Sequence, residues 1–302
     1  MSAPASETVL PAVPPLGTLY LRGVTAGARL AAARRRGQAP GTLPDVAYAA
    51  HDIAVDPLRL SAYQSLLGLR AADRLPAGFV HVLAFPVATA LMVRPDFPLP
   101  LVGLVHVANE VTQRRPLWRG DRVDVRTWAQ DLRPHRAGTA VDLVAEVRRT
   151  GSDELAWRGV STYLAKGVRL GEEIAPDDER TPFLAPLPTG AWRLAADTGR
   201  RYAAVSGDRN PIHLSAVTAR PFGFRKAIAH GMYTAARALA DVGPAAGHAF
   251  TWSVELASPV LLPATVAVRV APEGDGYGYA AWNPSSGKPH LTGSVRPLTP
   301  LR

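Results

Sequence analysis

The stretch YAAVSGDRNPIHLSAVTARPFGFRKAIAHGMYT, residues 202–234, decides how this chain is interpreted. Within it, GDRNPIH places a carboxylate, Asp208, five residues before an imidazole, His213. Gly, Asp, Asn and Pro in this order are typical of a tight bend, not of a packed helix, and such a bend turns both side chains toward one point. An acid, a base and a nearby glycine N–H, here Gly231, are the groups needed to move a proton beside a polarised carbonyl.

A purely structural interpretation of the same bend is also open. Pro211 can open a helix at its first position with Asn210 as the N-cap, and Asp208 would then be a turn residue and His213 an ordinary surface residue. Local spacing alone does not separate the two interpretations.

An internal repeat bears on this choice. The two halves align at a period of about 140 residues, which is too long for a solenoid and indicates a duplicated domain. The aligned segments, in chain order, are 63–70 with 202–209, 83–86 with 228–231, 116–126 with 259–269, and 150–164 with 284–298. The first copy keeps Gly68 but has Leu69 in place of Asp208, and it has Phe85-Pro86 where the second copy has His230-Gly231. A structural turn would be needed in both copies, so the loss of the polar residues from one copy favours a single active site.

Each half combines helical and strand patterns. Residues 227–241 are Ala-rich and predict a helix, and 25–36 predict one basic helix near the N-terminus. Alternating patterns predict strands at 104–111, 122–129, 139–148, 155–165, 250–255, 265–270, 277–282 and 291–295. One helix followed by several antiparallel strands predicts an α+β layer design with a sheet wrapped around a helix.

The predicted organisation follows from the repeat and from composition. Residues 1–45 form an N-terminal extension, 46–165 a degenerate first domain, 166–188 a linker rich in Pro, Gly and acidic residues, and 189–302 the domain that carries the motif.

Composition limits the function classes. The apolar run 82–93 is shorter than the ~20 residues of a membrane span and contains Pro86, and no signal peptide is apparent, so we expect a cytoplasmic protein without a membrane partner. The chain has no cysteine, and its histidines show no metal-ligand spacing, so we expect no disulfide and no metal. The net charge of +9 favours an anionic partner. Nucleic acid is disfavoured because the charge is dispersed and no aromatic residues are interleaved with a basic stripe.

The motif YAAVSGDRNPIHLSAVTA followed by IAHGM resembles the hydratase signature of the MaoC-like (R)-specific enoyl-CoA hydratases and dehydratases, which have the hot-dog fold. The whole length, with a first copy that lacks the motif, resembles the double-hot-dog 3-hydroxyacyl-thioester dehydratases of actinobacterial type. The resemblance covers residues of about 45 to 300. It implies that Asp208 and His213 are the catalytic pair, that Gly231 supplies an oxyanion N–H, and that each chain has one site.

The expected reaction is (R)-specific hydration of (2E)-enoyl thioesters, or the reverse dehydration, without a cofactor. The expected partner is an acyl thioester of coenzyme A or acyl carrier protein, and a homodimer is the candidate assembly. Asn210 and His230 are further candidates for the oxyanion and substrate site, although His230 is favoured in a structural role, and Arg225 and Lys226 are candidate phosphate contacts. Two alternatives stay open: a hot-dog thioesterase, and a binding module that carries acyl groups without catalysis.

Overall fold

In the computed structural model, which describes residues 4–171 and 182–298, the chain divides into two units that each combine antiparallel strands with helices. The first unit consists of Met1–Ala54, Val80–Val107 and Asp121–Glu179, and the second of Val55–Phe79, Ala108–Gly120 and Arg180–Arg302. These two units are defined by which residues lie close in space, and not by the sequence repeat. They therefore do not test the domain boundaries predicted after residues 45, 165 and 188, which stay predictions. Residues 172–181 of the predicted linker lie outside the described residues.

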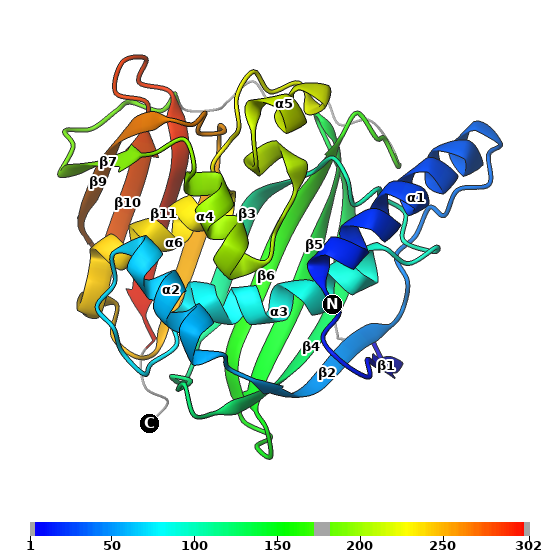
Figure 1. Cartoon of the computed structure of the whole chain (residues 1–302), viewed down its shortest axis with the longest axis horizontal. Coiled ribbons are helices and arrows are strands. Elements are labelled where there is room, and N and C mark those ends of the chain that lie inside the picture. The colour runs from blue at the N-terminus through cyan, green and yellow to red at the C-terminus, as the bar shows by residue number, and fades with distance from the viewer. Residues whose placement is uncertain (1–3, 172–181, 299–302) are drawn as a thin grey trace. The chain divides into compact units, whose positions relative to one another are not determined.

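The first unit is a sheet covered by two helices. Its strands, in sheet order, are β1 (Glu7–Val9), β2 (Ala47–Ala54), β4 (Arg122–His135), β5 (Gly138–Arg149) and β6 (Leu155–Lys166). All neighbours pair antiparallel except β1 with β2. Figure 1 shows the helix α1 (Leu16–Arg35) and the later part of α3 (Ala77–Met92) on one face of these strands. The buried side chains of Leu19 on α1, Leu91 on α3 and Leu143 on β5 belong to one core.

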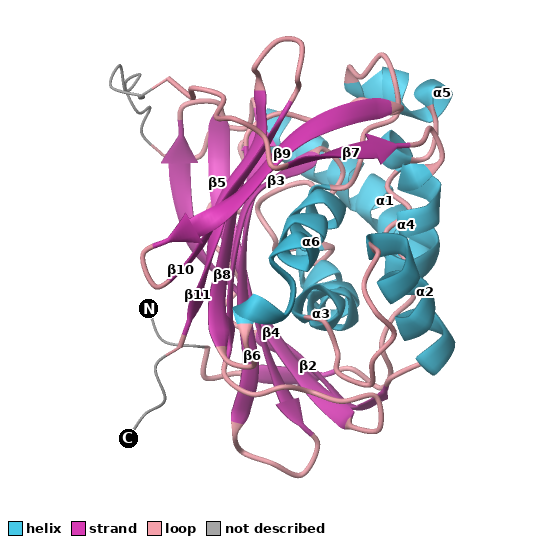
Figure 2. Cartoon of the chain, turned by 90° about the vertical axis from the view of Figure 1, so that its left-hand side faces the viewer, coloured by secondary structure: helices cyan, strands magenta, loops and turns pink. Residues whose placement is uncertain are grey.

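The second unit repeats this design around a different helix. Its strands, in sheet order, are the later part of β3 (Leu104–Gln113), β8 (Phe250–Leu256), β11 (Pro289–Pro297), β10 (Gly276–Trp282), β9 (Ala264–Glu273) and β7 (Gly190–Leu194), all antiparallel. The Ala-rich α6 (Gly231–Val242) packs on β8 to β11. Figure 2 shows α6 between these strands and the outer helices α2 (Pro57–Leu67) and α4 (Thr198–Ser206). Short helical turns complete the unit: η1 (Pro211–His213), α5 (Ala216–Ala219), η2 (Arg220–Phe222) and η3 (Gly243–Ala246).

The duplication is visible in the order of elements. The series β2, α2, α3, β3 to β6 matches the series β7, α4, α6, β8 to β11. The helices α2 and α4 both end on a left-handed glycine, Gly68 at φ 70° and Gly207 at φ 80°, a conformation that glycine adopts at little cost. The alignment of these two glycines in the sequence is therefore confirmed.

One part of the sequence alignment is wrong. The N–H of Leu75 donates to the Leu117 carbonyl at 2.8 Å, just as the N–H of Ala229 donates to the Val260 carbonyl at 2.9 Å. The partners Leu117 and Val260 are aligned in the repeat, so Leu75 corresponds to Ala229. Pro76 and Ala77, and not Phe85 and Pro86, therefore stand where the second copy has His230 and Gly231. The first copy therefore has neither the histidine nor the glycine at these two positions.

The predicted strands are all present, and the two predicted helices begin elsewhere. The helix expected at 227–241 starts only at Gly231, because Ala227 and Ala229 form backbone hydrogen bonds with Leu262 and Val260. The basic helix expected at 25–36 starts earlier, at Leu16. Within the described residues, no helix has the length and apolar character to cross a membrane.

Candidate functional site

The bend after α4 is built from local hydrogen bonds around Asp208. The hydroxyl of Ser206 accepts from the Asp208 N–H at 3.1 Å and donates to the Tyr202 carbonyl at 2.8 Å. The Asp208 Oδ1 accepts from the N–H of Asn210 at 3.1 Å, which closes an Asx turn. The carboxylate is thereby fixed on a turn whose entry is the left-handed Gly207.

His213 follows on the short helix η1 and is buried. Its Nδ1 lies 2.9 Å from the carbonyl oxygen of Ile228. Because a carbonyl oxygen only accepts, Nδ1 carries the proton, and the neutral ring keeps its lone pair on Nε2. Burial lowers the pKa of His213 below its ordinary value, while Asp208 and the Ile228 carbonyl act in the opposite direction. The ring is therefore a neutral base at pH 7.

His230 lies against the imidazole of His213. The two rings stack with centroids 3.6 Å apart and planes at 25°. The Nε2 of His230 lies 3.0 Å from the Asp208 carbonyl oxygen and must donate to it, whereas Nδ1 is buried without a hydrogen-bond partner among the described residues. Burial and the neighbouring His213 lower the pKa of His230 to about 3. The side chain makes no helix-capping bond, so its interaction is with the Asp208 turn.

Gly231 is the first residue of α6, with His230 as N-cap. The first N–H groups of a helix have no intrahelical acceptor, and they point outward at the positive end of the helix dipole. A Cβ on Gly231 would lie 2.5 Å from Leu256 Cδ1, so this residue also packs closely on β8. The residue to which the resemblance assigns the oxyanion N–H therefore also packs closely in the fold.

The site contains a group of side chains that could in principle bind a metal ion. One potential ligand atom from each of Asp208, His213 and His230 lies within 4.8 Å of the other two. A metal ion lies in the plane of an imidazole ligand at about 2.0–2.1 Å from its nitrogen. Two rings stacked face to face at 3.6 Å cannot both direct an in-plane lone pair at one ion. The arrangement suits a water held between a carboxylate and an imidazole better than a metal with two histidine ligands.

Three other predicted site residues are Asn210, which caps a helical turn, and the exposed Arg225 and Lys226. The Oδ1 of Asn210 accepts from the N–H of Ile212 at 3.4 Å and caps η1, and Pro211 occupies the first turn, as the structural interpretation of the bend predicts. Arg225 and Lys226 are exposed on the loop that leads to α6. Their predicted contact with phosphates stays a prediction.

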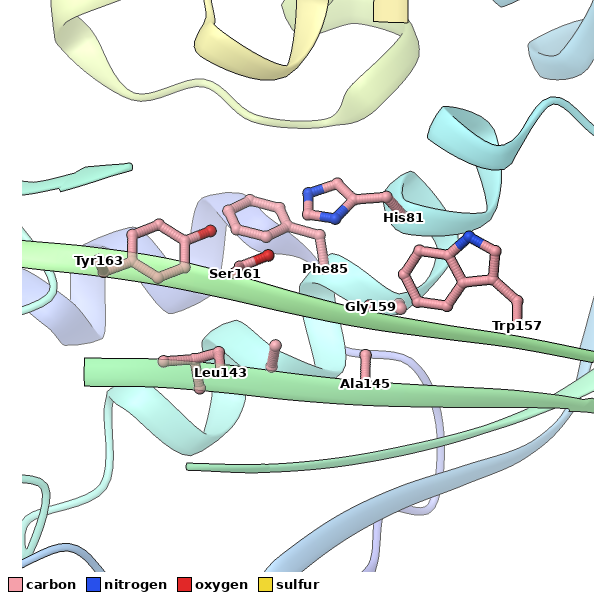
Figure 3. A pocket seen from close by; sticks show the side chains of 10 residues that line it. His81, Phe85, Leu143, Ala145, Trp157, Gly159, Ser161 and Tyr163 are labelled. Atoms are coloured by element: carbon pink, nitrogen blue, oxygen red, sulfur yellow. The ribbon is translucent and has the colours of Figure 1, made fainter. Parts of the chain in front are cut away.

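The first unit holds a buried polar group that sequence analysis missed. His81 on α3 lines a cavity of about 10 Å³, roughly the room of one water, together with Phe85, Ser161 and Tyr163 (Figure 3). The sequence offered one signal, a histidine inside an otherwise apolar helix. Phe85 borders this cavity, and Leu91 on the same helix is fully buried in the core. The cavity is too small for an acyl chain.

Comparisons with known proteins show which family the chain resembles. Residues 182–281 match the family model described as a MaoC like domain. The chain is 40% identical over 257 residues to 3-hydroxyacyl-thioester dehydratase X of Mycobacterium tuberculosis, covering 85% of this chain and 91% of that protein. The chain belongs to the MaoC-like dehydratase family. As a member of this family it is an enzyme of the hydro-lyase class.

Solved structures support the same assignment for this MaoC-like dehydratase. The crystal structure of HtdX from Mycobacterium tuberculosis has a TM-score of 0.74 at 37% identity and covers 83% of this chain and 100% of its own. A Mycobacterium tuberculosis protein described as having a double hotdog fold has a TM-score of 0.53 at 14% identity, covering 85% and 95%. The predicted α+β double hot-dog fold is confirmed.

Gly199, in the first turn of α4, lies closely against the backbone of His213 in this MaoC-like dehydratase. A Cβ on Gly199 would lie 2.1 Å from the His213 carbonyl oxygen, which is backbone and cannot swing aside. We expect Gly199→Ala to lower kcat by roughly tenfold, because small displacements of a catalytic group are costly. Gly17→Ala in α1 is the matched control, since a Cβ there has no neighbour within 4 Å. Equal kcat values for both variants in an enoyl-thioester hydration assay would contradict this role.

The buried His230 makes stability depend on pH. Its pKa is about 3 in the folded chain and 6.5 in an ordinary environment, so the unfolded state binds a proton first as the pH falls. We expect the free energy of unfolding to decrease below pH 6.5 by up to about 1.4 kcal/mol per pH unit from this group, with no such loss above it. Urea unfolding between pH 4 and 8 measures the slope. His230→Gln should flatten it, and an unchanged slope in that variant would refute the assignment.

Proposed function

We propose that this protein adds water reversibly to (2E)-enoyl thioesters and forms (R)-3-hydroxyacyl thioesters. The observation that carries the proposal is the hydrogen bond from His213 Nδ1 to the Ile228 carbonyl, which leaves Nε2 as a base close to the Asp208 carboxylate. The name of the relative, a 3-hydroxyacyl-thioester dehydratase, supports the substrate class. The (R) configuration rests on the resemblance of the motif to the (R)-specific hydratases.

In the hydration direction, Asp208 and His213 hold one water between them. As the water oxygen bonds to C3, one of its protons passes to this pair, and the π electrons of the C2–C3 bond move toward the thioester oxygen. A proton then passes from the pair to C2, so that H and OH are added in balance. Because burial keeps His213 neutral, the base is available at pH 7.

The enolate oxygen that develops needs hydrogen-bond donors. The N–H of Gly231 is one of the donors that α6 leaves without an intrahelical acceptor, and the helix dipole favours negative charge there. We assign this N–H to the thioester oxygen. Donors of this kind are typically worth a factor of about 10²–10³ in kcat.

The carrier is an anionic group, either coenzyme A or acyl carrier protein. The segment of residues 198–240 contains seven arginine and lysine residues. Asp208 is the one acidic residue of that segment. Two of the basic residues, Arg225 and Lys226, are exposed one loop away from His230 and Gly231. We assign them to the phosphates of the carrier, because clustered positive charge attracts such groups. A homodimer stays the candidate assembly.

A hydration assay with crotonyl-CoA tests the proposal. We expect loss of the enoyl absorbance, an (R)-3-hydroxybutyryl product by a stereospecific dehydrogenase assay, and the same rate after dialysis against a chelator. Titration with a tight-binding hydroxyacyl analogue should give one site per chain. Release of free thiol without hydration would instead identify a thioesterase, and binding of the analogue without either reaction would identify a non-catalytic acyl carrier.

A further inference from the structure

We infer that Arg59, in the half of the repeat that lacks the Asp–His pair, is a positioning residue for the Asp208 turn. This inference rests on the proposed function, because it assigns Arg59 a role in the same reaction. Arg59 lies on α2 and its guanidinium reaches the last turn of α4, the helix that ends two residues before Asp208.

The contacts of Arg59 are directed at the backbone. Its Nε donates to the Val205 carbonyl at 2.6 Å, and its Nη2 donates to the Ser206 carbonyl at 2.9 Å. The last carbonyl groups of a helix have no intrahelical donor, and a cation is favoured at this end of the helix dipole. The planar guanidinium matches two adjacent carbonyls as no other side chain can.

Arg59 is itself held in place. Asp56 caps α2 and accepts from the Arg59 N–H at 3.3 Å, and its negative charge raises the pKa of Arg59, although burial lowers that pKa by more. Removing a guanidinium cation from water costs free energy unless its N–H groups donate hydrogen bonds within the protein. The Val205 and Ser206 carbonyls of α4 accept these hydrogen bonds.

The chain of contacts leads to the backbone of Asp208, the residue that carries the carboxylate. Arg59 fixes the backbone of Ser206, the Ser206 hydroxyl accepts from the Asp208 N–H, and His230 donates to the Asp208 carbonyl. The turn is therefore held from α2 on one side and from the N-terminus of α6 on the other. Loss of Arg59 leaves two helix-end carbonyls without their charged donor and loosens the residue before Gly207.

Arg59→Met tests the inference, with Arg59→Lys as the conservative variant and Leu67→Ala as the control. Leu67 is buried at the far end of α2, so its truncation lowers stability while the Arg59 bonds to the Val205 and Ser206 carbonyls are kept. With crotonyl-CoA we expect Arg59→Met to lower kcat by tenfold to a hundredfold with KM changed less than about threefold. Arg59→Lys should recover part of kcat, and Leu67→Ala should keep it at a temperature where both proteins are folded.

A second measurement does not depend on turnover. Among the described residues, Asp208 and His230 are the titratable groups that face His213, and Asp208 raises its pKa. The NMR signal of the His213 imidazole is identified as the one that is absent in His213→Ala. If the Asp208 carboxylate moves away from this ring in Arg59→Met, the signal should titrate at a lower pH than in the wild type. Wild-type titration together with a kcat loss no larger than that of Leu67→Ala would overturn the inference. A wild-type protein that does not hydrate crotonyl-CoA would defeat the proposed function, while this titration would still decide the role of Arg59.

Discussion

Replacing His213 by alanine, or Asp208 by asparagine, should lower kcat for crotonyl-CoA hydration by roughly a hundredfold or more, as expected for loss of an acid–base group. His213→Ala removes the lone pair that the Ile228 carbonyl leaves on Nε2. Asp208→Asn keeps the Oδ1 that accepts from Asn210, so the turn is retained while the charge is lost. Both variants should stay folded by circular dichroism.

Arg209→Ala is the matched control for this pair. Arg209 occupies the same turn, between Asp208 and Asn210, but is exposed. We expect kcat within about twofold of the wild type, since surface substitutions away from special features have small effects. Near-wild-type activity in both His213→Ala and Asp208→Asn would remove the pair from the catalytic site.

Replacing Gly231 by alanine should lower kcat by about a hundredfold, because an oxyanion must come within about 3 Å of the N–H and we expect an added Cβ to obstruct that approach. The variant should also lose some stability, because the same Cβ would lie 2.5 Å from Leu256 Cδ1. Activity and melting temperature measured on the same preparation give both effects.

The double variant Gly231→Ala/Leu256→Ala separates the two effects. Shortening Leu256 removes the atom that the new Cβ would meet, so part of the lost melting temperature should return. If Gly231 binds the thioester oxygen, kcat stays low in the double variant. Recovery of kcat together with stability, measured against Leu256→Ala alone, would show that the glycine is needed for packing only.

The order of residues was enough to predict the duplication, the strands and the candidate site residues. Alternation along β4 to β6 and β8 to β11 comes from residues a few positions apart, and those strands lie where the pattern places them. The Gly-Asp-x-Asn-Pro turn is equally local, since Gly207 supplies the left-handed end of α4 and Asn210 caps η1. Short-range chemistry of this kind is present in the residue order.

The contacts that hold the site together come from distant parts of the chain and could not be predicted from the residue order. The proton on His213 is placed by the Ile228 carbonyl fifteen residues away, and the Asp208 turn is fixed by His230 and by Arg59, which acts on residues 146 and 147 positions further along the chain. The start of α6 at Gly231 likewise depends on the hydrogen bonds of Ala227 and Ala229 with the 260–262 segment. No local pattern encodes these partners, because a carbonyl group is the same in every residue and becomes a specific acceptor only when the fold brings one donor to it.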